Sequence, residues 1–372
     1  MISIEQKILA CAAGLSTGSH QQRRLRRLMS QGMDAASLTD LAINESLTGF
    51  LYKSLVESDA LHHLTHAEIE CIRFLHQRTV FLNMKLMHDC HVLLHQLNEK
   101  GIKVVLLKGI SLLHRVYEDI GLRPMMDIDL WVPRDNYPAL ISILSMQGYR
   151  RDPLYPNTFT RGATIIDLHT HILGAERIKA RERLFSRSQD HFFHDAISIT
   201  VAGEEAWCLT EYDQVIYLSL HALKHNVDRL IWLVDIARII ANWGTPQWQA
   251  LIDRSRFMGQ ERSVSYILFL IRRLLGVSFP PHVTSELHLE GLSVLERRLL
   301  RKRLNSRSLP LWAPLFLFSP DRGLRERIYS ITETLFPKPA ILRQVFVSPR
   351  TLKVWELYLK RVHQLITMIG KV

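Results

Sequence analysis

The chain has 372 residues, of which 47% are hydrophobic, so it is long enough to bury a full core and to hold two or three subdomains. Its four cysteines are scattered without a Cys-x-x-Cys pair, which argues against a structural zinc site or a disulfide framework and favours a reducing cytoplasm. The segment 1–7 carries charges and no run of about 18 uncharged apolar residues is present, so we expect neither a signal peptide nor a membrane span.

The formal net charge is +11, and much of the excess lies in the segments 23–27 and 297–303. A basic balance suits a polyanionic partner such as a nucleoside triphosphate, RNA or an anionic lipid. Each basic run is also explained as the solvated face of a helix, and neither holds the interleaved aromatic residues of a platform for single-stranded nucleic acid. The charge therefore favours anion binding without choosing the anion, and nucleic acid is an open but not a favoured partner.

In chain order, the hydrophobic pattern first predicts helices from Ser3 to about Lys100. A strand over 102–107, a helix over 111–120, a strand over 128–132 and a helix over 137–146 follow. Further strands are expected at 149–151, 158–160, 164–172 and 197–201. Helices return after Thr210, at 212–221 and in a buried helix at 230–240, and continue to the end of the chain. We therefore expect an α+β fold in three parts, with an N-terminal helical subdomain (1–100), an α/β core (101–205) and a C-terminal helical region (206–372).

The most informative segment is the expected strand over 128–132, because two carboxylates interrupt its apolar pattern. Asp127 and Asp129 lie two positions apart, and the geometry of a strand places both side chains on one face. Two neighbouring carboxylates at a buried strand repel each other and are costly to desolvate. Hard divalent cations with oxygen ligands relieve both costs best, so the pair predicts a metal site.

A third carboxylate candidate lies in the expected strand that follows. There Asp167, His169 and His171 share one face. If this strand neighbours that of Asp127 and Asp129, three carboxylates converge, and together with triphosphate oxygens they are able to hold two Mg²⁺ or Mn²⁺ ions for an in-line displacement. Lys108 and Gly109, between a strand and a helix, are candidates for the phosphate-binding turn, and Arg123 for a further cation. An ordinary strand-to-helix turn explains the Lys-Gly pair equally well.

The segment from Val104 to Tyr149 resembles the uncharacterised nucleotidyltransferase family of the DNA polymerase β superfamily. The motifs that carry the resemblance are Leu107-Lys108-Gly109, the run from Arg123 to Val132 (RPMMDIDLWV) and Gly148-Tyr149. A later Asp-Leu-His motif at 167–169 and a helical motif with His221, His225, Trp232 and Asp235 extend the resemblance over about 60–240.

The resemblance implies a polymerase-β-like core and a metal-dependent nucleotidyltransferase that moves a nucleoside monophosphate from a triphosphate to an acceptor hydroxyl or phosphate. Asp127 and Asp129 would bind two metal ions, and Asp167 would be the third acid. Lys108 and Gly109 would take the place of the superfamily's Gly-Ser phosphate loop, with Ser111 as a nearby hydroxyl. The acceptor is open, with a small molecule or a peptide or protein favoured. We expect Trp131, where the family has leucine, on the face opposite the carboxylates.

Several residues have two interpretations. The Asp167-x-His169-x-His171 face is also typical of metal-dependent hydrolases, although His169 is better explained as a residue that orients Asp167. His221 and His225, four apart on a helix, either line the cleft or contact the nucleotide base or acceptor. Asp235, in an apolar helix, either pairs with a buried cation such as Arg229 or Arg238 or contacts substrate. A non-catalytic nucleotide-binding or antitoxin-like protein that retains the transferase fold is the main alternative function.

Overall fold

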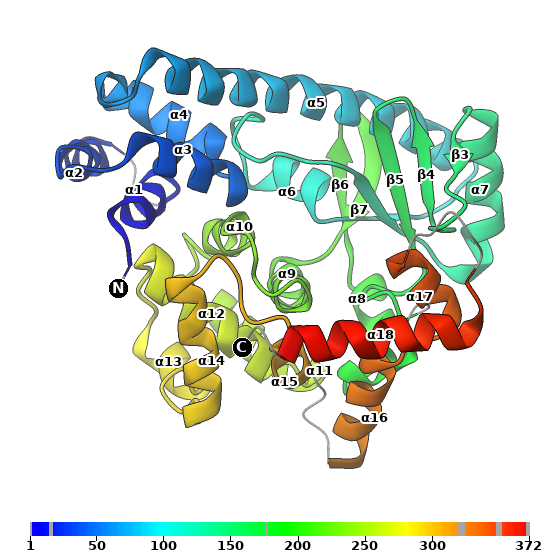
Figure 1. The fold of residues 1–372 in the computed structure, drawn as a ribbon. Helices are drawn as coiled ribbons and strands as arrows, with labels where there is room; N and C mark the ends of the chain where they lie inside the picture. Colours follow the sequence, from blue (N-terminus) through cyan, green and yellow to red (C-terminus); the bar gives the residue numbers. More distant parts are fainter. Residues whose placement is uncertain (1, 15–17, 176–177, 319–323, 347–351, 370–372) are drawn as a thin grey trace.

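The computed structural model describes residues 2–14, 18–175, 178–318, 324–346 and 352–369, and its centre is a seven-stranded mixed sheet (Figure 1). The strand order is β3-β4-β5-β2-β1-β7-β6. Neighbours β2 and β5 are parallel, as are β1 and β7, and the other pairs are antiparallel. The strands are β1 Val105–Leu107, β2 Ile128–Trp131, β3 Arg150–Arg151, β4 Thr158–Arg161, β5 Thr164–His169, β6 Ile197–Val201 and β7 Glu204–Cys208. The expected combination of a mixed sheet with flanking helices is confirmed.

Helices fill the segment before the sheet, as predicted. They are α1 Ile4–Ala12, α2 Ser19–Met29, α3 Ala35–Asn44, α4 Thr48–Glu57, η1 Leu61–His63 and α5 His66–Glu99. The long helix α5 begins at a capping box, in which Thr65 and Glu68 satisfy each other's backbone N–H groups. It runs across the top of the sheet in Figure 1 and contacts β5 and β7.

The alternation of β5 shows how the sheet separates its two faces. Thr164, Ile166 and Leu168 are buried, whereas Asp167 and His169 are partly exposed on the other face. On the buried face the Thr164 hydroxyl donates to Asp89 of α5. The remaining elements of this region are α6 Gly109–Arg115, η2 Arg134–Asn136, α7 Tyr137–Met146, η3 Lys179–Leu184 and α8 Asp190–His194.

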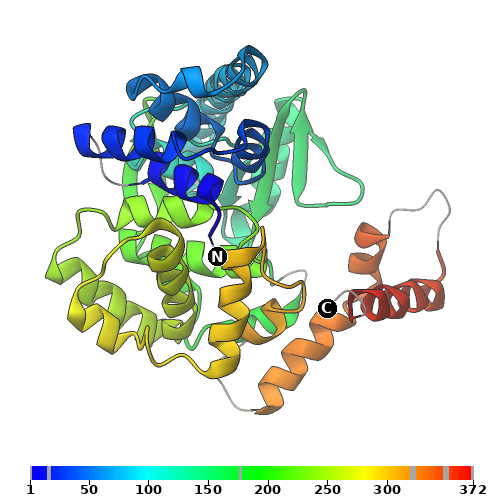
Figure 2. The ribbon, with the colours of Figure 1, turned by 60° about the vertical axis from the view of Figure 1, so that its left-hand side comes forward.

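The chain after the sheet is helical. Its elements are α9 Glu211–Lys224, α10 Ile231–Ile239, α11 Thr245–Met258, α12 Glu261–Leu275, α13 Pro281–Glu286, α14 Val294–Asn305, α15 Pro314–Leu317, α16 Leu324–Leu335, α17 Pro339–Val345 and α18 Val354–Ile369. Helix α10 is buried on most of its surface, as expected from its sequence. Figure 2 shows α16–α18 projecting from the body, and a small separate cluster of Leu342, Leu352 and Leu357 packs α17 against α18.

One continuous hydrophobic core connects the N-terminal helices, the sheet and the helices up to α15. A buried ion pair joins the two helical parts, because the Arg303 guanidinium donates to both carboxylate oxygens of Glu45 at 2.7 and 3.0 Å. The Leu230 backbone N–H donates to the same carboxylate. The start of α10 is thereby fixed against the end of α3.

Four local predictions differ from the structure. The strand expected over 102–107 is β1 and begins only at Val105. The helix expected at 111–120 is α6 and ends at Arg115, and the strand expected to reach Ile172 ends at His169. Strand β7 was not predicted, because Glu204 and Glu205 obscure its alternation. Among the described residues, none of the helices combines the length and apolar character that crossing a membrane requires.

Candidate active site

Three carboxylates meet on one face of the sheet, where β2 and β5 run side by side. In the register of these strands Asp129 lies opposite Asp167, and Asp127 comes two positions before Asp129. Alternate residues of an extended chain share a face, so the three side chains lie on the same side. Each offers an oxygen, and these oxygens all lie within 4.8 Å of one another. The structure thus brings together the three acids that the sequence singled out.

Asp129 is the buried centre of the group and carries two polar partners. Lys108 donates to its Oδ1 at 2.6 Å, and His169 Nε2 lies 2.9 Å from the same oxygen. Burial alone would raise the pKa of Asp129, but the Lys108 ammonium and the His169 ring outweigh it and hold that pKa well below its usual range. The pKa of Lys108 is raised, because the charge of Asp129 outweighs the effect of burial. Asp129 is therefore ionised and paired at neutral pH.

Asp127 has the opposite electrostatic environment. Burial and then the neighbouring charge of Asp129 raise the pKa of Asp127 to about 6, although Lys108 acts against both. An ionised Asp127 beside an ionised Asp129 is an uncompensated negative charge. A divalent cation at this position would remove the cost, and the all-oxygen donor set of the group is the kind that Mg²⁺ and Mn²⁺ accept.

Asp167 is held by a residue that the sequence analysis did not identify. The Thr158 hydroxyl, on β4, donates to its Oδ1 at 2.5 Å, because Thr158 lies opposite Asp167 in the antiparallel register of β4 and β5. This bond leaves Oδ2 of Asp167 for another partner. The signal available in the sequence was the polar Thr158-Phe159-Thr160 alternation, which does not by itself reveal its cross-strand neighbour.

The Lys-Gly turn joins β1 to α6 in a conformation that few residues adopt. Lys108 has φ of +48°, and a Cβ on Gly109 would lie 2.8 Å from the Met125 sulfur and 3.1 Å from an Arg123 nitrogen, so a larger residue there would have to displace these two side chains. Ser111, one turn into α6, is buried and its hydroxyl donates to the Lys108 carbonyl at 3.3 Å. The structure places Lys108 at the carboxylates and gives the Ser111 hydroxyl a partner within its own turn.

Arg123 and Asp235 form a buried ion pair with each other. Arg123 donates through Nε and one terminal nitrogen to the two oxygens of Asp235, each at 2.9 Å, and the Tyr117 hydroxyl donates to Oδ1 at 2.6 Å. The expectation of Arg229 or Arg238 as the partner of Asp235 is wrong. Proximity in the helix suggested these residues, whereas the actual partner comes from the chain before β2.

Helix α9 places His221 and His225 on one face, as their spacing predicted. Their rings lie 4.7 Å apart and pack at 5.0 and 5.5 Å against Trp232. Burial, followed by nearby lysines, lowers the pKa of His221 well below its usual value and that of His225 to about 3, so both rings are neutral. Tyr217, one turn before His221, is buried close enough to Lys108 and Asp129 for their charges to act on its hydroxyl, and the sequence analysis missed it.

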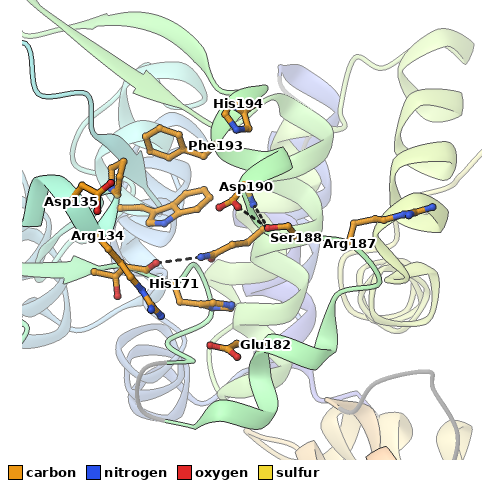
Figure 3. Close-up of a pocket in the computed structure, with 13 residues that line it drawn as sticks. Arg134, Asp135, His171, Glu182, Arg187, Ser188, Asp190, Phe193 and His194 are labelled. Atoms are coloured by element: carbon orange, nitrogen blue, oxygen red, sulfur yellow. Dashed lines mark hydrogen bonds between the residues drawn. The ribbon is translucent and has the colours of Figure 1, made fainter.

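A cavity of about 590 Å³ lies near the C-terminal ends of β2 and β5, and Figure 3 shows side chains that line it, among them His171, Arg134 and Phe193. Trp131 lies opposite His169 in the register of β2 and β5 and lines this cavity, so the expectation that it occupies the other face is wrong. Alternate residues of a strand point to the same face, so Trp131 lies on the same face of β2 as Asp129. His171 is also in the wall and is almost fully buried. Burial and Arg134 lower its pKa to about 4, and its Nδ1 accepts from Leu173 N–H, so the ring is neutral with its proton on Nε2.

The histidine that ends β5, His169, and the histidine two positions beyond it, His171, therefore have different surroundings. His169 contacts Asp129 rather than the expected Asp167, and His171 faces the cavity. Within the described residues the only group of three or more potential metal ligands close together is Asp127, Asp129 and Asp167, which includes neither histidine. The arrangement of the hydrolase alternative, a metal held by an Asp-x-His-x-His strand, is not found in this part of the chain.

The chain matches the model of a family described as uncharacterised nucleotidyltransferase over residues 31–276, about two thirds of its length. The protein belongs to this family. A search of curated proteins found no match. Among solved structures, the solution structure of the antibiotic-resistance factor ANT(2'')-Ia is similar at 17% identity with a TM-score of 0.34, over 47% of this chain and 94% of that one.

Proposed function

We propose that this member of the nucleotidyltransferase family transfers a nucleoside monophosphate from a nucleoside triphosphate to an acceptor, with two divalent ions, Mg²⁺ or Mn²⁺, at the three carboxylates. The observation that carries the proposal is the convergence of Asp127, Asp129 and Asp167 within 4.8 Å in a chain of this family. An oxygen-rich group of this kind suits hard cations. The acceptor that we favour is a hydroxyl or phosphate of a small molecule, peptide or protein.

The fit of the group to divalent cations rests on its electrostatics. Burial and then the charge of Asp129 raise the pKa of Asp127, and Lys108 and His169 offset this only in part, so a cation beside Asp127 would favour its ionised form. Asp127, Asp129 and Asp167 would hold the ions, with triphosphate oxygens completing the coordination. When bound, such ions polarise the phosphoryl oxygens and neutralise charge on the attacking and leaving groups.

In the proposed reaction an acceptor oxygen attacks the α-phosphorus, the bond from that phosphorus to the β-bridging oxygen breaks, and pyrophosphate leaves. The acceptor's proton passes to the free oxygen of Asp167, which Thr158 holds by the other oxygen. Lys108, which now donates to Asp129, would be free to pair with the triphosphate once cations neutralise that carboxylate, and Gly109 would let the backbone approach the phosphates. Ser111 and Arg123, which have partners of their own, support this turn rather than contact the phosphates.

The cavity beyond Asp129 and Asp167 supports a small acceptor or a single side chain of a larger one. Its volume of about 590 Å³ suits a molecule of drug-like size. The Trp131 ring would offer an aromatic wall, and the Nε2–H of His171, a residue that lines the cavity, would be a donor for a hydroxyl or carbonyl of the acceptor. The neutral rings of His221 and His225 stay candidates for contact with the nucleotide base or the acceptor.

The proposal is tested by incubating the enzyme and cell extract with α-labelled nucleoside triphosphates and Mg²⁺. We expect a product heavier than its acceptor by one nucleoside monophosphate, detected by mass spectrometry, and equimolar pyrophosphate. The double variant Asp127→Asn/Asp129→Asn should abolish both signals, whereas Asp40→Asn, an exposed acid on α3, should leave them unchanged. A metal-dependent thermal shift with triphosphate but no transferred label from any extract would favour the non-catalytic nucleotide-binding alternative. Labelling in the double variant at the wild-type rate would refute the proposal.

A further inference from the structure

A second, polar cavity lies between α6, α9 and α10. Its volume is about 360 Å³, and the polar side chains that line it include Ser111, Arg115, Gln214, Arg238, Asn242 and Gln247. We call it the α6–α10 cavity. Among the described residues that line it, none is a member of the carboxylate group, so a ligand in this cavity would leave Asp127, Asp129 and Asp167 accessible.

Gln214 is the first sign that this cavity is built for a ligand. Its side chain is 2% exposed, and neither its amide nitrogen nor its amide oxygen has a hydrogen-bond partner in the described part of the chain. A buried amide without partners costs folding free energy, and a leucine at this position would avoid the cost. A ligand that satisfies both atoms must both accept and donate a hydrogen bond.

Arg238 is the second sign. Its guanidinium lies over the rings of Phe50 and Tyr117, at 4.8 and 5.4 Å from their centroids. No hydrogen bond or ion pair to it is found within the described residues, and its Nε is buried without a partner. The carboxylate of the same helix, Asp235, is already paired with Arg123. Arg238 is thus a half-buried cation that lines the cavity and has no ion-pair partner among the described residues.

The rest of the lining leaves a surplus of positive charge. Arg115 lies 3.7 Å from the carboxylate of Glu211, which also accepts from the Trp243 indole at 3.0 Å. The lining therefore holds two guanidinium groups, those of Arg115 and Arg238, but one carboxylate, that of Glu211. Asn242 and Gln247 add side-chain amides, and the Gln247 oxygen is occupied by the Gly244 N–H, which leaves its NH₂ group as a donor.

We propose that the α6–α10 cavity binds a small hydroxylated oxyanion, with the anionic group paired to Arg238 and a hydroxyl group hydrogen-bonded to the Gln214 amide. Phosphate and carboxylate share the chemistry that Arg238 recognises, and a neutral polyol lacks it. Ser111 and Arg115 connect the cavity to α6, the helix that begins at Lys108-Gly109. The ligand would therefore bind beside the phosphate turn without occupying it.

The test uses the full chain in EDTA, so that no divalent ion recruits ligands to the carboxylates. Glucose 6-phosphate, gluconate and glucose are titrated by calorimetry and by thermal shift. We expect glucose 6-phosphate or gluconate to bind and glucose not to bind. Arg238→Met should weaken binding at least about tenfold, as expected for loss of a charge-assisted hydrogen bond. Asp127→Asn should bind as the wild type does, which separates this site from the proposed catalytic function.

Gln214→Leu supplies the second readout. If the amide is unsatisfied in the free protein, this variant should melt at the wild-type temperature or above it and should lose the ligand-induced shift. A variant that melts well below the wild type would show that ordered water already satisfies the amide, which contradicts the proposal. The proposal is also overturned if neither oxyanion binds, if Arg238→Met keeps full affinity, or if Asp127→Asn abolishes binding.

Discussion

The buried pair of Arg123 and Asp235 allows a stability prediction worked directly from the structure. The Asp235 side chain is fully buried, that of Arg123 is 9% exposed, and the carboxylate accepts two hydrogen bonds from Arg123 and one from Tyr117. Asp235→Asn leaves the guanidinium buried without a counter-charge, which costs about 3–5 kcal/mol. Tyr117→Phe keeps the ion pair and removes one hydrogen bond to a charged group, so we expect a smaller loss of about 1.5–3 kcal/mol.

The measurement is urea unfolding followed by circular dichroism and tryptophan fluorescence. The double variant Arg123→Met/Asp235→Leu should recover most of the loss, because apolar side chains of similar volume replace a buried ion pair at little cost. The control is Glu70→Gln, which breaks an exposed pair with Arg73 at 3.0 Å on α5. That change should alter the free energy of unfolding by less than about 1 kcal/mol.

The result also decides between two roles for Arg123. If Asp235→Asn costs no more than Glu70→Gln, the guanidinium does not depend on Asp235, and the phosphate-binding role that the sequence suggested gains support. If Asp235→Asn lowers the free energy of unfolding by the expected amount and the double variant restores most of it, the role of Arg123 is to pair with Asp235 in the core. Arg123 lies against the Lys108-Gly109 turn, 3.1 Å from where a Cβ on Gly109 would be, so a loss of activity would then follow from displacement of this turn.

Three further predictions concern the carboxylates and the core. Because the pKa of Asp127 is raised to about 6, its ionisation destabilises the metal-free fold as the pH rises from about 4 to 6. In EDTA at pH 7.5, Asp127→Asn should therefore increase the free energy of unfolding, by as much as roughly 3 kcal/mol, and the gain should vanish below about pH 4. Thr158→Val should lower Mn²⁺ affinity in calorimetry by about 10–100-fold, and Thr158→Ser should retain it; equal affinity in both variants would show that the hydroxyl does not orient Asp167. Glu45→Gln should cost about 3–5 kcal/mol in urea unfolding, because it leaves Arg303 buried with a weaker partner, and a loss below 1 kcal/mol would contradict this.

The carboxylate face was predictable because it depends on local geometry. The alternation of apolar and acidic residues identifies β2 and β5. Because side chains alternate between the two faces of a strand, the faces that carry Asp129 and Asp167 follow before any partner strand is known. The misplacement of Trp131 was an error in applying this rule, since residues 129 and 131 must share a face. The sequence predicted that the three carboxylates converge only if β5 lies beside β2. The structure shows that β5 and β2 are parallel neighbours.

Partners that come from distant segments were not predictable in the same way. Arg123 meets Asp235 across 112 positions of chain, and Glu45 meets Arg303 across 258. A buried carboxylate requires a cationic partner, but the sequence alone does not indicate which of the 47 lysines and arginines that partner is. Thr158 shows the same limit at shorter range, because its role follows from the register of β4 against β5. Local pattern predicts which side chain needs a partner, and the tertiary fold selects the partner.

Lys108 connects the two halves of the proposed chemistry. In the free protein its ammonium lies 2.6 Å from Asp129 and partly neutralises the same carboxylates that the proposed metal ions require. In the proposed reaction a metal ion would compete with Lys108 for Asp129, and the triphosphate would offer the displaced ammonium a new anion. Lys108→Met should then strengthen the binding of Mn²⁺ in the absence of nucleotide. The same variant should weaken the binding of triphosphate in the presence of Mn²⁺, and calorimetry measures both affinities. If Lys108 merely stabilised the fold, the variant would change the affinities for Mn²⁺ and for triphosphate in the same direction. Competition between lysine and metal requires the two affinities to change in opposite directions.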